Sequence, residues 1–137
     1  LISVREELDI LEHYINILKQ RFQEDLMITQ QIDVATYNTK IPKLLIQSII
    51  ENSIKHGFSP NNKKLSVNLA IRNEKEGLLI SIENNGKKLP ELPIDPNNGI
   101  GIVNIKERLN ALYEDNYSFT MGNSNTGVKT EVLVPNS

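Results

Sequence analysis

The chain of 137 residues carries 15 Lys and Arg against 17 Asp and Glu, which gives a formal net charge of -2 at pH 7. A nucleic-acid-binding surface normally brings an excess of positive charge, so this balance argues against nucleic acid as a partner. No Cys is present, which excludes a disulfide framework and a thiolate metal site.

The length fits a single domain that buries a substantial core. No run reaches the roughly 18 apolar residues of a membrane span, and no signal peptide opens the chain. The sequence begins at Leu1, without a start methionine and inside a helical pattern. We therefore expect a soluble segment of a longer protein, in which membrane spans could lie upstream.

The N-terminal pattern predicts a helix over about residues 2–23, because apolar residues recur at alternating steps of three and four. These residues are Leu1, Val4, Leu8, Leu11, Ile15, Leu18 and Phe22. So narrow a seam suits packing on another helix. Packing on the chain's own domain is the alternative, and the sequence leaves both open.

Residues 26–34 alternate loosely and predict a strand, which is followed by a turn. The next segment, 42–56, has the pattern of a helix. Pro42 suits its first turn, and Gly57 suits a left-handed residue just past its end. Asn38 or Thr39 would cap it with a side-chain oxygen.

The two sides of this central helix differ at about 100° per residue. The apolar side consists of Ile46, Ile49, Ile50, Ser53 and Ile54. The opposite side consists of Ser48, Glu51, Asn52 and Lys55. It places an amide, a carboxylate and an ammonium about one turn apart, which favours a binding site over the alternative of an ordinary surface stripe.

The C-terminal half predicts two strand pairs with a helix between them. In order, these are a hairpin of strands around 65–71 and 78–82, a turn at 84–86, an extended loop at 87–98, a helix from 99 onward, and strands at 117–121 and 128–134. The elements together favour an α+β two-layer sandwich, with a mixed sheet of about five strands and helices on one face.

Gly99 and Gly101 stand at the start of the second long helix. A Gly-x-Gly pair before a helix leaves backbone N–H groups free to receive a phosphate, and the helix dipole favours the anion. A Rossmann dinucleotide site is disfavoured, because no strand directly precedes Gly99 and Asn104 stands at the third glycine position.

Residues 50–57 read Ile-Glu-Asn-Ser-Ile-Lys-His-Gly. This run resembles the N box of the GHKL ATP-binding superfamily, in the form found in LytS-type sensor histidine kinases. The resemblance covers essentially the whole chain and implies the Bergerat fold. It also implies that Asn52 holds a magnesium ion, that Lys55 meets phosphate, and that His56 flanks the adenine.

Three further boxes extend the resemblance. Gly99-x-Gly101-x-x-Asn104 is similar to the family's second glycine box, and 127–130 to its last box, whose Thr is Thr130 here. In the adenine box the family has Asp-x-Gly-x-Gly, whereas this chain has Asn84, Gly86 and Lys88. An Asn oxygen still accepts a hydrogen bond from the adenine amino group, although it brings no charge.

The resemblance thus implies a site for ATP and Mg2+, with Asn52 as the metal-binding residue. Its residues would be Ser48, Asn52, Lys55, His56, Asn84, Gly86, Gly99, Gly101, Ile102, Asn104 and Thr130. Residues 87–98 would form the ATP lid. Hydrolytic members of the superfamily have a Glu four residues before the metal-binding Asn, and Ser48 at that position argues against an ATPase.

The function implied is that of the catalytic domain of a two-component sensor histidine kinase, a transferase that passes phosphate from ATP to a His outside this chain. Residues 1–23 resemble the end of the dimerisation and phosphoacceptor helix, and 24–137 the ATP-binding domain. The phosphorylated His lies in an Asn-Pro-His-Phe motif that this chain lacks, so His13 is not that residue.

The partners implied are the protein's own phosphoacceptor domain and a response regulator, plausibly of the LytTR type. A cytoplasmic domain of a membrane-anchored homodimer is the expected setting. Asn84 and Lys88 keep open a catalytically degenerate nucleotide-binding or interaction module of the same fold. A serine kinase acting on a partner protein shares these boxes, but the dimerisation-like first helix speaks against it.

Overall fold

The computed structural model describes residues 1–61, 63–89 and 100–136 of the chain. The elements in order are β1 (Ile2–Ser3), α1 (Val4–Phe22), η1 (Gln23–Asp25), β2 (Leu26–Ile32), η2 (Val34–Thr36), β3 (Lys40–Ile41), α2 (Leu45–Gly57), β4 (Leu65–Glu74), β5 (Gly77–Asn84), α3 (Ile100–Tyr113), β6 (Ser118–Asn123) and β7 (Val128–Val134). Here η1 and η2 are short 3-10 turns.

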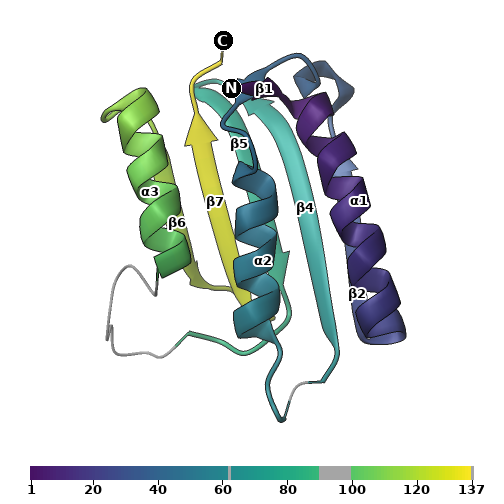
Figure 1. Ribbon diagram of the computed structural model, residues 1–137. Coiled ribbons are helices and arrows are strands. Elements are labelled where there is room, and N and C mark those ends of the chain that lie inside the picture. Colours follow the sequence, from purple (N-terminus) through teal and green to yellow (C-terminus); the bar gives the residue numbers. More distant parts are fainter. Residues whose placement is uncertain (62, 90–99, 137) are drawn as a thin grey trace.

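These elements form two layers, in which α1, α2 and α3 cover one face of a five-stranded sheet (Figure 1). The strand order is β2-β4-β5-β7-β6, with β2 parallel to β4 and the other neighbours antiparallel. The predicted α+β sandwich with a mixed five-stranded sheet is therefore confirmed. A small second sheet, in which β1 pairs with β3, was not predicted.

Alternation along the strands explains why only one face is covered. In β4 the inward residues Leu65, Val67, Leu69 and Ile71 are at most 2% exposed. Their neighbours point to the open face, where Thr29 Oγ1 donates a hydrogen bond to Asn68 Oδ1 at 2.8 Å. Polar pairs of this kind let that face meet water. None of the described helices is long and apolar enough to cross a membrane.

Helix α1 packs on its own domain, which was one of the two alternatives. Val4 and Leu11 are fully buried, and Ile15 and Leu18 are nearly so. Phe22 at its C-terminal end stacks on Phe58 just past α2, with ring centroids 4.9 Å apart. The division of the chain at residue 23 into two domains stays a prediction.

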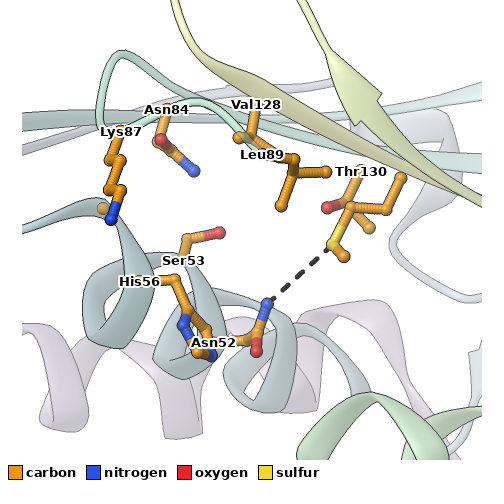
Figure 2. Close-up of a pocket in the computed structure, with 10 residues that line it drawn as sticks. Asn52, Ser53, His56, Asn84, Lys87, Leu89, Val128 and Thr130 are labelled. Carbon is orange, nitrogen blue, oxygen red and sulfur yellow. Dashed lines mark hydrogen bonds between the residues drawn. The ribbon is translucent and has the colours of Figure 1, made fainter. Parts of the chain in front are cut away.

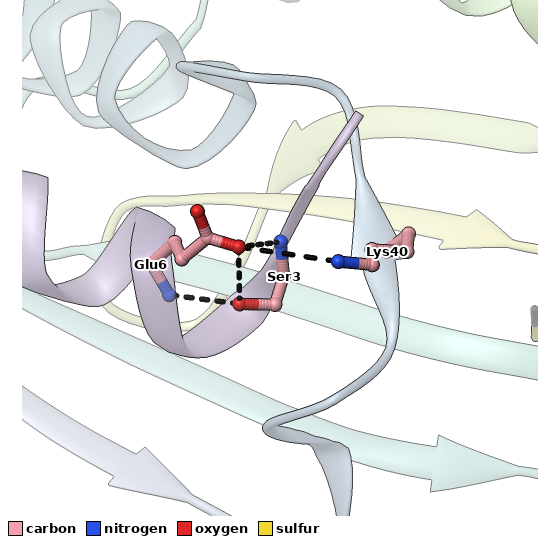
Figure 3. Close-up of polar contacts among 3 residues, drawn as sticks. All are labelled: Ser3, Glu6 and Lys40. Carbon is pink, nitrogen blue, oxygen red and sulfur yellow. Dashed lines mark hydrogen bonds and ion pairs between the residues drawn. The ribbon is translucent and has the colours of Figure 1, made fainter.

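A capping box fixes the start of α1 (Figure 3). Ser3 Oγ accepts from the Glu6 N–H at 3.1 Å, and Glu6 Oε1 accepts from the Ser3 N–H at 3.2 Å. These two orphan donors are thus satisfied reciprocally. The hydrogen bonds from Ser3 hold the pKa of Glu6 below its usual value, with a smaller contribution from Lys40, whose Nζ lies 3.9 Å away.

The predicted ends of the central helix were wrong. Helix α2 begins at Leu45, three residues after Pro42, because Leu44 turns the chain with a left-handed φ of 66°. At the other end, Gly57 is the last helical residue and has no left-handed φ. Glycine is needed there for space, since a Cβ would lie 2.7 Å from Leu65 Cδ1.

The cap of α2 also differs from the prediction that Asn38 or Thr39 would supply it. The cap is the carboxylate of Glu7 in α1, which is fully buried. It accepts backbone hydrogen bonds from Leu44 at 2.7 Å, Ile46 at 3.1 Å and Gln47 at 3.3 Å. Burial raises the pKa of Glu7, and these three hydrogen bonds oppose the rise.

At the C-terminal end of α2, the backbone of Gly57 lies close to the backbone of Gly86. A Cβ at Gly86, just after β5, would lie 2.5 Å from Gly57 Cα and 2.6 Å from Gly57 O. The neighbouring Lys87 N–H donates to Gly57 O at 3.2 Å. Only glycine at position 86 lets these backbones approach so closely.

We predict that Glu7→Ala lowers the free energy of unfolding by about 2–4 kcal/mol, because it removes a helix cap and leaves buried N–H groups without an acceptor. Urea denaturation measures the loss. Glu12→Ala removes an exposed carboxylate from the same helix and should cost less than about 0.5 kcal/mol. Equal losses in the two variants would contradict the capping role.

We predict that Gly86→Ala lowers the free energy of unfolding by about 1–3 kcal/mol, because its methyl group must push α2 away from the end of β5. Gly122→Ala in β6 is the matched control, since a Cβ there meets nothing within 4 Å. It should leave stability unchanged or slightly raised. A Gly86→Ala variant as stable as the control would show that the close contact can relax freely.

Candidate functional site

A pocket lies between α2 and the sheet, and it encloses about 290 Å³ of space including its open mouth. Its lining residues are Asn52, Ser53, His56, Gly57, Asn84, Lys87, Leu89, Met121, Val128 and Thr130. Figure 2 shows α2 on one side and strand residues on the other. The pocket therefore joins residues that lie up to 78 positions apart in the sequence.

The end of β5 contributes Asn84, which is 4% exposed. Its Oδ1 accepts a hydrogen bond from the Gly86 N–H at 2.9 Å. The Nδ2 makes no hydrogen bond to the described residues, and in Figure 2 it points toward the space beside Ser53. The pocket thus has a buried amide donor at this place.

Two hydroxyl groups face the same space. Ser53 is 5% exposed and Thr130 is 3% exposed, yet neither side chain makes a hydrogen bond within the described part of the chain. Among described residues, the Tyr113 hydroxyl is the only side-chain polar atom that is both sealed from solvent and unpaired. The Ser53 and Thr130 hydroxyls must therefore reach the pocket surface, where a ligand or water would pair with them.

Asn52 lies at the edge of the pocket and is half-buried. Its Nδ2 approaches Met121 Sδ at 4.0 Å (Figure 2). A thioether is a weak acceptor, so this contact holds the amide loosely. The Oδ1 makes no hydrogen bond to the described residues, which suits an oxygen ligand for Mg2+.

His56 follows one turn after Asn52 and lines the same pocket. Burial lowers the pKa of its imidazole, and the neighbouring Lys55 adds to this effect. Both effects favour the uncharged form of the ring.

A second hollow of about 740 Å³ adjoins the mouth of the pocket, with which it shares His56, Lys87 and Leu89. Its lining also includes Lys55 and Lys88, and no carboxylate is among the described residues that line it. The positive charge of these lysines would attract an anionic ligand to the mouth.

Of the predicted site residues, four line the pocket: Asn52, His56, Asn84 and Thr130. Gly86 lies directly behind Asn84, and Lys55 lines the adjoining hollow. Ser48 is half-buried one turn earlier in α2 and lines neither.

The remaining predicted residues lie on or before α3. Gly101 and Asn104 are exposed, whereas the Ile102 side chain is 1% exposed and belongs to the core. Gly99 lies outside the described residues. A Cβ at Gly101 would meet no described atom within 4 Å, so the surrounding fold does not explain this glycine.

Helices α2 and α3 lie side by side, with the start of α3 at the same end of the layer as the C-terminal end of α2 (Figure 1). The C-terminal end of α2 and the N-terminal end of α3 therefore lie toward one edge of the domain. No group of three His, Asp or Glu side chains that could hold a metal occurs among the described residues. A metal at this edge would need ligand oxygens from a bound molecule in addition to Asn52.

The sequence analysis missed several lining residues, among them Ser53, Leu89, Met121 and Val128. Ser53 had been placed on the apolar side of α2, and a single small hydroxyl there gives no warning of a pocket. Met121 and Val128 fit the alternation of inward strand residues, so their pattern does not distinguish pocket from core.

The chain is similar to curated sensor histidine kinases along 98% of its length. It is 28% identical over 138 residues to the sensor histidine kinase YesM of Bacillus subtilis and 26% identical over 144 residues to the sensor protein LytS of Staphylococcus epidermidis. It spans 24% of the length of each of these relatives. No family model matches the chain.

Among solved structures, the catalytic domain of histidine kinase ThkA superposes with a TM-score of 0.71, at 11% sequence identity, over 98% of this chain and 94% of that domain. Identity this low carries the fold alone. By sequence the chain is thus a relative of the LytS-type sensor histidine kinases, and its fold is that of a histidine kinase catalytic domain, as its motifs had indicated.

Proposed function

We propose that this chain is the ATP-binding catalytic domain of a sensor histidine kinase and positions Mg-ATP for phosphoryl transfer to a His located outside residues 1–137. The observation that supports this best is the convergence of Asn52, His56, Asn84 and Thr130 in one pocket with unpaired polar groups. The names of the relatives, which are sensor histidine kinases, agree with it.

The purine would enter the pocket between α2 and the sheet. His56 would pack beside it as a neutral ring, while Thr130 and Asn84 would offer hydrogen bonds from the sheet side. Because Thr130 and Asn84 are buried, most water is excluded from them, and each of their polar contacts would be stronger than at an exposed site.

The triphosphate would leave the pocket through its mouth, toward the end of the domain where α3 begins. Lys55, Lys87 and Lys88 line that mouth and would offset the negative charge. Asn52 Oδ1 would hold Mg2+, which when bound supplies charge neutralisation to the phosphates. Positioning and electrostatic stabilisation supply most of the rate in phosphoryl transfer.

The same proposal covers the full-length protein. It would carry the phosphoacceptor His, act together with a response regulator, and be a membrane-anchored homodimer. Residues 1–23 would follow the phosphoacceptor segment in the chain. Glu7 in α1 caps α2, the helix that carries Asn52. A movement of the phosphoacceptor segment would therefore shift α1 and, through these hydrogen bonds, α2.

The second candidate is a module of the same fold that binds nucleotide without catalysis. It is favoured by one observation: Asn84 presents an uncharged amide, not a carboxylate, at the floor of the pocket. Transfer of the γ-phosphoryl of ATP to the full-length protein, as acid-labile phosphohistidine, separates the two. Nucleotide binding without transfer would establish the degenerate module.

Calorimetric titration with Mg-ATP tests the shared premise. We expect saturable binding with a dissociation constant in or below the millimolar range. Absence of heat at millimolar nucleotide would discard the kinase assignment.

We predict that Asn52→Ala weakens Mg-ATP binding at least about 100-fold, because it removes the only protein oxygen assigned to the metal. The melting temperature of the nucleotide-free chain should move by less than about 3 °C, since among the described residues the Asn52 side chain hydrogen-bonds only to Met121, and weakly. Calorimetry and a thermal melt measure the two quantities.

Asn110→Ala is the matched control, because it makes the same chemical change on an exposed part of α3. It should leave both the affinity and the melting temperature unchanged. A large loss of stability in Asn52→Ala, with little loss of affinity, would assign Asn52 to the fold.

A further inference from the structure

One peptide group is held by charged side chains from two different helices. The Lys43 carbonyl oxygen accepts a hydrogen bond from Arg108 Nη2 in α3. The Leu44 N–H donates to Glu7 Oε1 in α1 at 2.7 Å. This C=O and this N–H belong to the same trans peptide group, in which they point in opposite directions. A cation therefore binds one side of the group and a carboxylate binds the other.

The two contacts support each other. The guanidinium of Arg108 polarises the Lys43 carbonyl, which makes the Leu44 N–H a better donor to the carboxylate. Hydrogen bonds to charged groups are also stronger than those between neutral groups. Burial raises the pKa of Glu7, and the backbone hydrogen bonds and then Arg108 oppose this rise. The buried carboxylate and the exposed cation thus form a pair with a peptide group between them.

The backbone at this point has an unusual conformation. Leu44 has a φ of 66°, in the left-handed region that a leucine seldom adopts. Such a conformation persists only where the surroundings fix it, and here Glu7 and Arg108 hold the peptide group that precedes the Leu44 Cα. The next residue, Leu45, begins α2. The two charged side chains therefore fix the place where α2 starts, and Arg108 ties α3 to it.

This tie lies at the opposite end of α2 and α3 from the proposed phosphate site. The two helices lie side by side and run in opposite directions, so that Arg108 is near the start of α2 while the start of α3 is near the end of α2 (Figure 1). Asn52 lies about 10 Å along α2 from Leu45, and Gly101 lies about 10 Å along α3 from Arg108. Joining the helices at one end thus defines their spacing at the other.

We propose that Arg108 is a positioning residue for the nucleotide site, because its bond to the Lys43 carbonyl sets the spacing of α2 and α3 where they meet the triphosphate. The inference rests on the proposed function, in which these phosphates and Mg2+ lie between Asn52 and the start of α3. Without the guanidinium, α3 is not tied to the start of α2, and part of the population has a spacing that does not fit the ligand. The apparent affinity falls in proportion to the fraction that remains competent.

Arg108→Met tests this role, because it removes the donor and the charge but keeps an unbranched aliphatic stem. The variant should fold, since Arg108 is exposed and the fully buried Leu109 still anchors α3. We expect calorimetric titration with Mg-ATP to show at least about a fivefold loss of affinity, which corresponds to about 1 kcal/mol. The melting temperature of the nucleotide-free chain should fall by less than about 5 °C.

Arg108→Lys is the conservative variant. Its ammonium keeps the positive charge and can still donate to the Lys43 carbonyl. The affinity for Mg-ATP should therefore stay within about twofold of the wild-type value. A loss as large as that of Arg108→Met would overturn the proposal, since neither the charge nor the donor would then account for the effect.

Arg5→Met is the matched control, because it makes the same chemical change at an exposed position of α1. The Arg5 side chain makes no hydrogen bond or ion pair to the described residues. This variant should bind Mg-ATP with wild-type affinity. An equal loss in Arg5→Met and Arg108→Met would overturn the proposal, because the overall charge of the chain would then set the affinity.

A merely structural role for Arg108 gives a different result. A lower melting temperature of Arg108→Met with an unchanged affinity for Mg-ATP would overturn the proposal and leave the proposed function in place. Failure of the wild-type chain to bind Mg-ATP at millimolar concentration would overturn the inference together with the proposed function.

Discussion

The position of α2 over the sheet is the constraint on which the pocket depends, and two contacts at opposite ends of the helix set it. At the N-terminal end, the buried Glu7 carboxylate accepts three backbone N–H groups and so ties α2 to α1. At the C-terminal end, Gly57 and Gly86 let the helix and the end of β5 meet at backbone distance. Between these contacts, α2 is held at the separation that leaves a slot beside Asn52 and Ser53.

Polar side chains line this slot at a place where a folded core would need only apolar ones. The inward face of β5 is apolar at Leu78, Ile80 and Ile82 and then changes to Asn84, while β7 places Thr130 next to Ile82 in the adjacent strand. Polar groups buried without partners cost stability. Their grouping at one end of an otherwise apolar face, where they reach the pocket surface, agrees with the proposed binding site.

The five-stranded sheet and its three helices could be predicted from the sequence because strand alternation and helix periodicity survive in them, and the family motifs named four of the residues that line the pocket. The ends of α2 could not be predicted from the sequence. Proline and glycine rules describe local backbone preferences, whereas this helix is capped by Glu7, 37 residues away from Leu44, and ended by contact with Leu65 and Gly86. A glutamate in an amphipathic helix looks the same whether it faces water or three N–H groups.

The same distinction applies to the chemistry of Asn84. Sequence comparison alone treats asparagine as a weaker version of the aspartate that the family motif has, since its oxygen can accept the same bond. In the structure the Gly86 N–H donates to that oxygen, and the Nδ2 is the end of the amide that points toward Ser53 (Figure 2). A carboxylate here would offer the pocket a second acceptor oxygen, whereas the amide offers a donor, so the two side chains differ in hydrogen-bonding character as well as in charge.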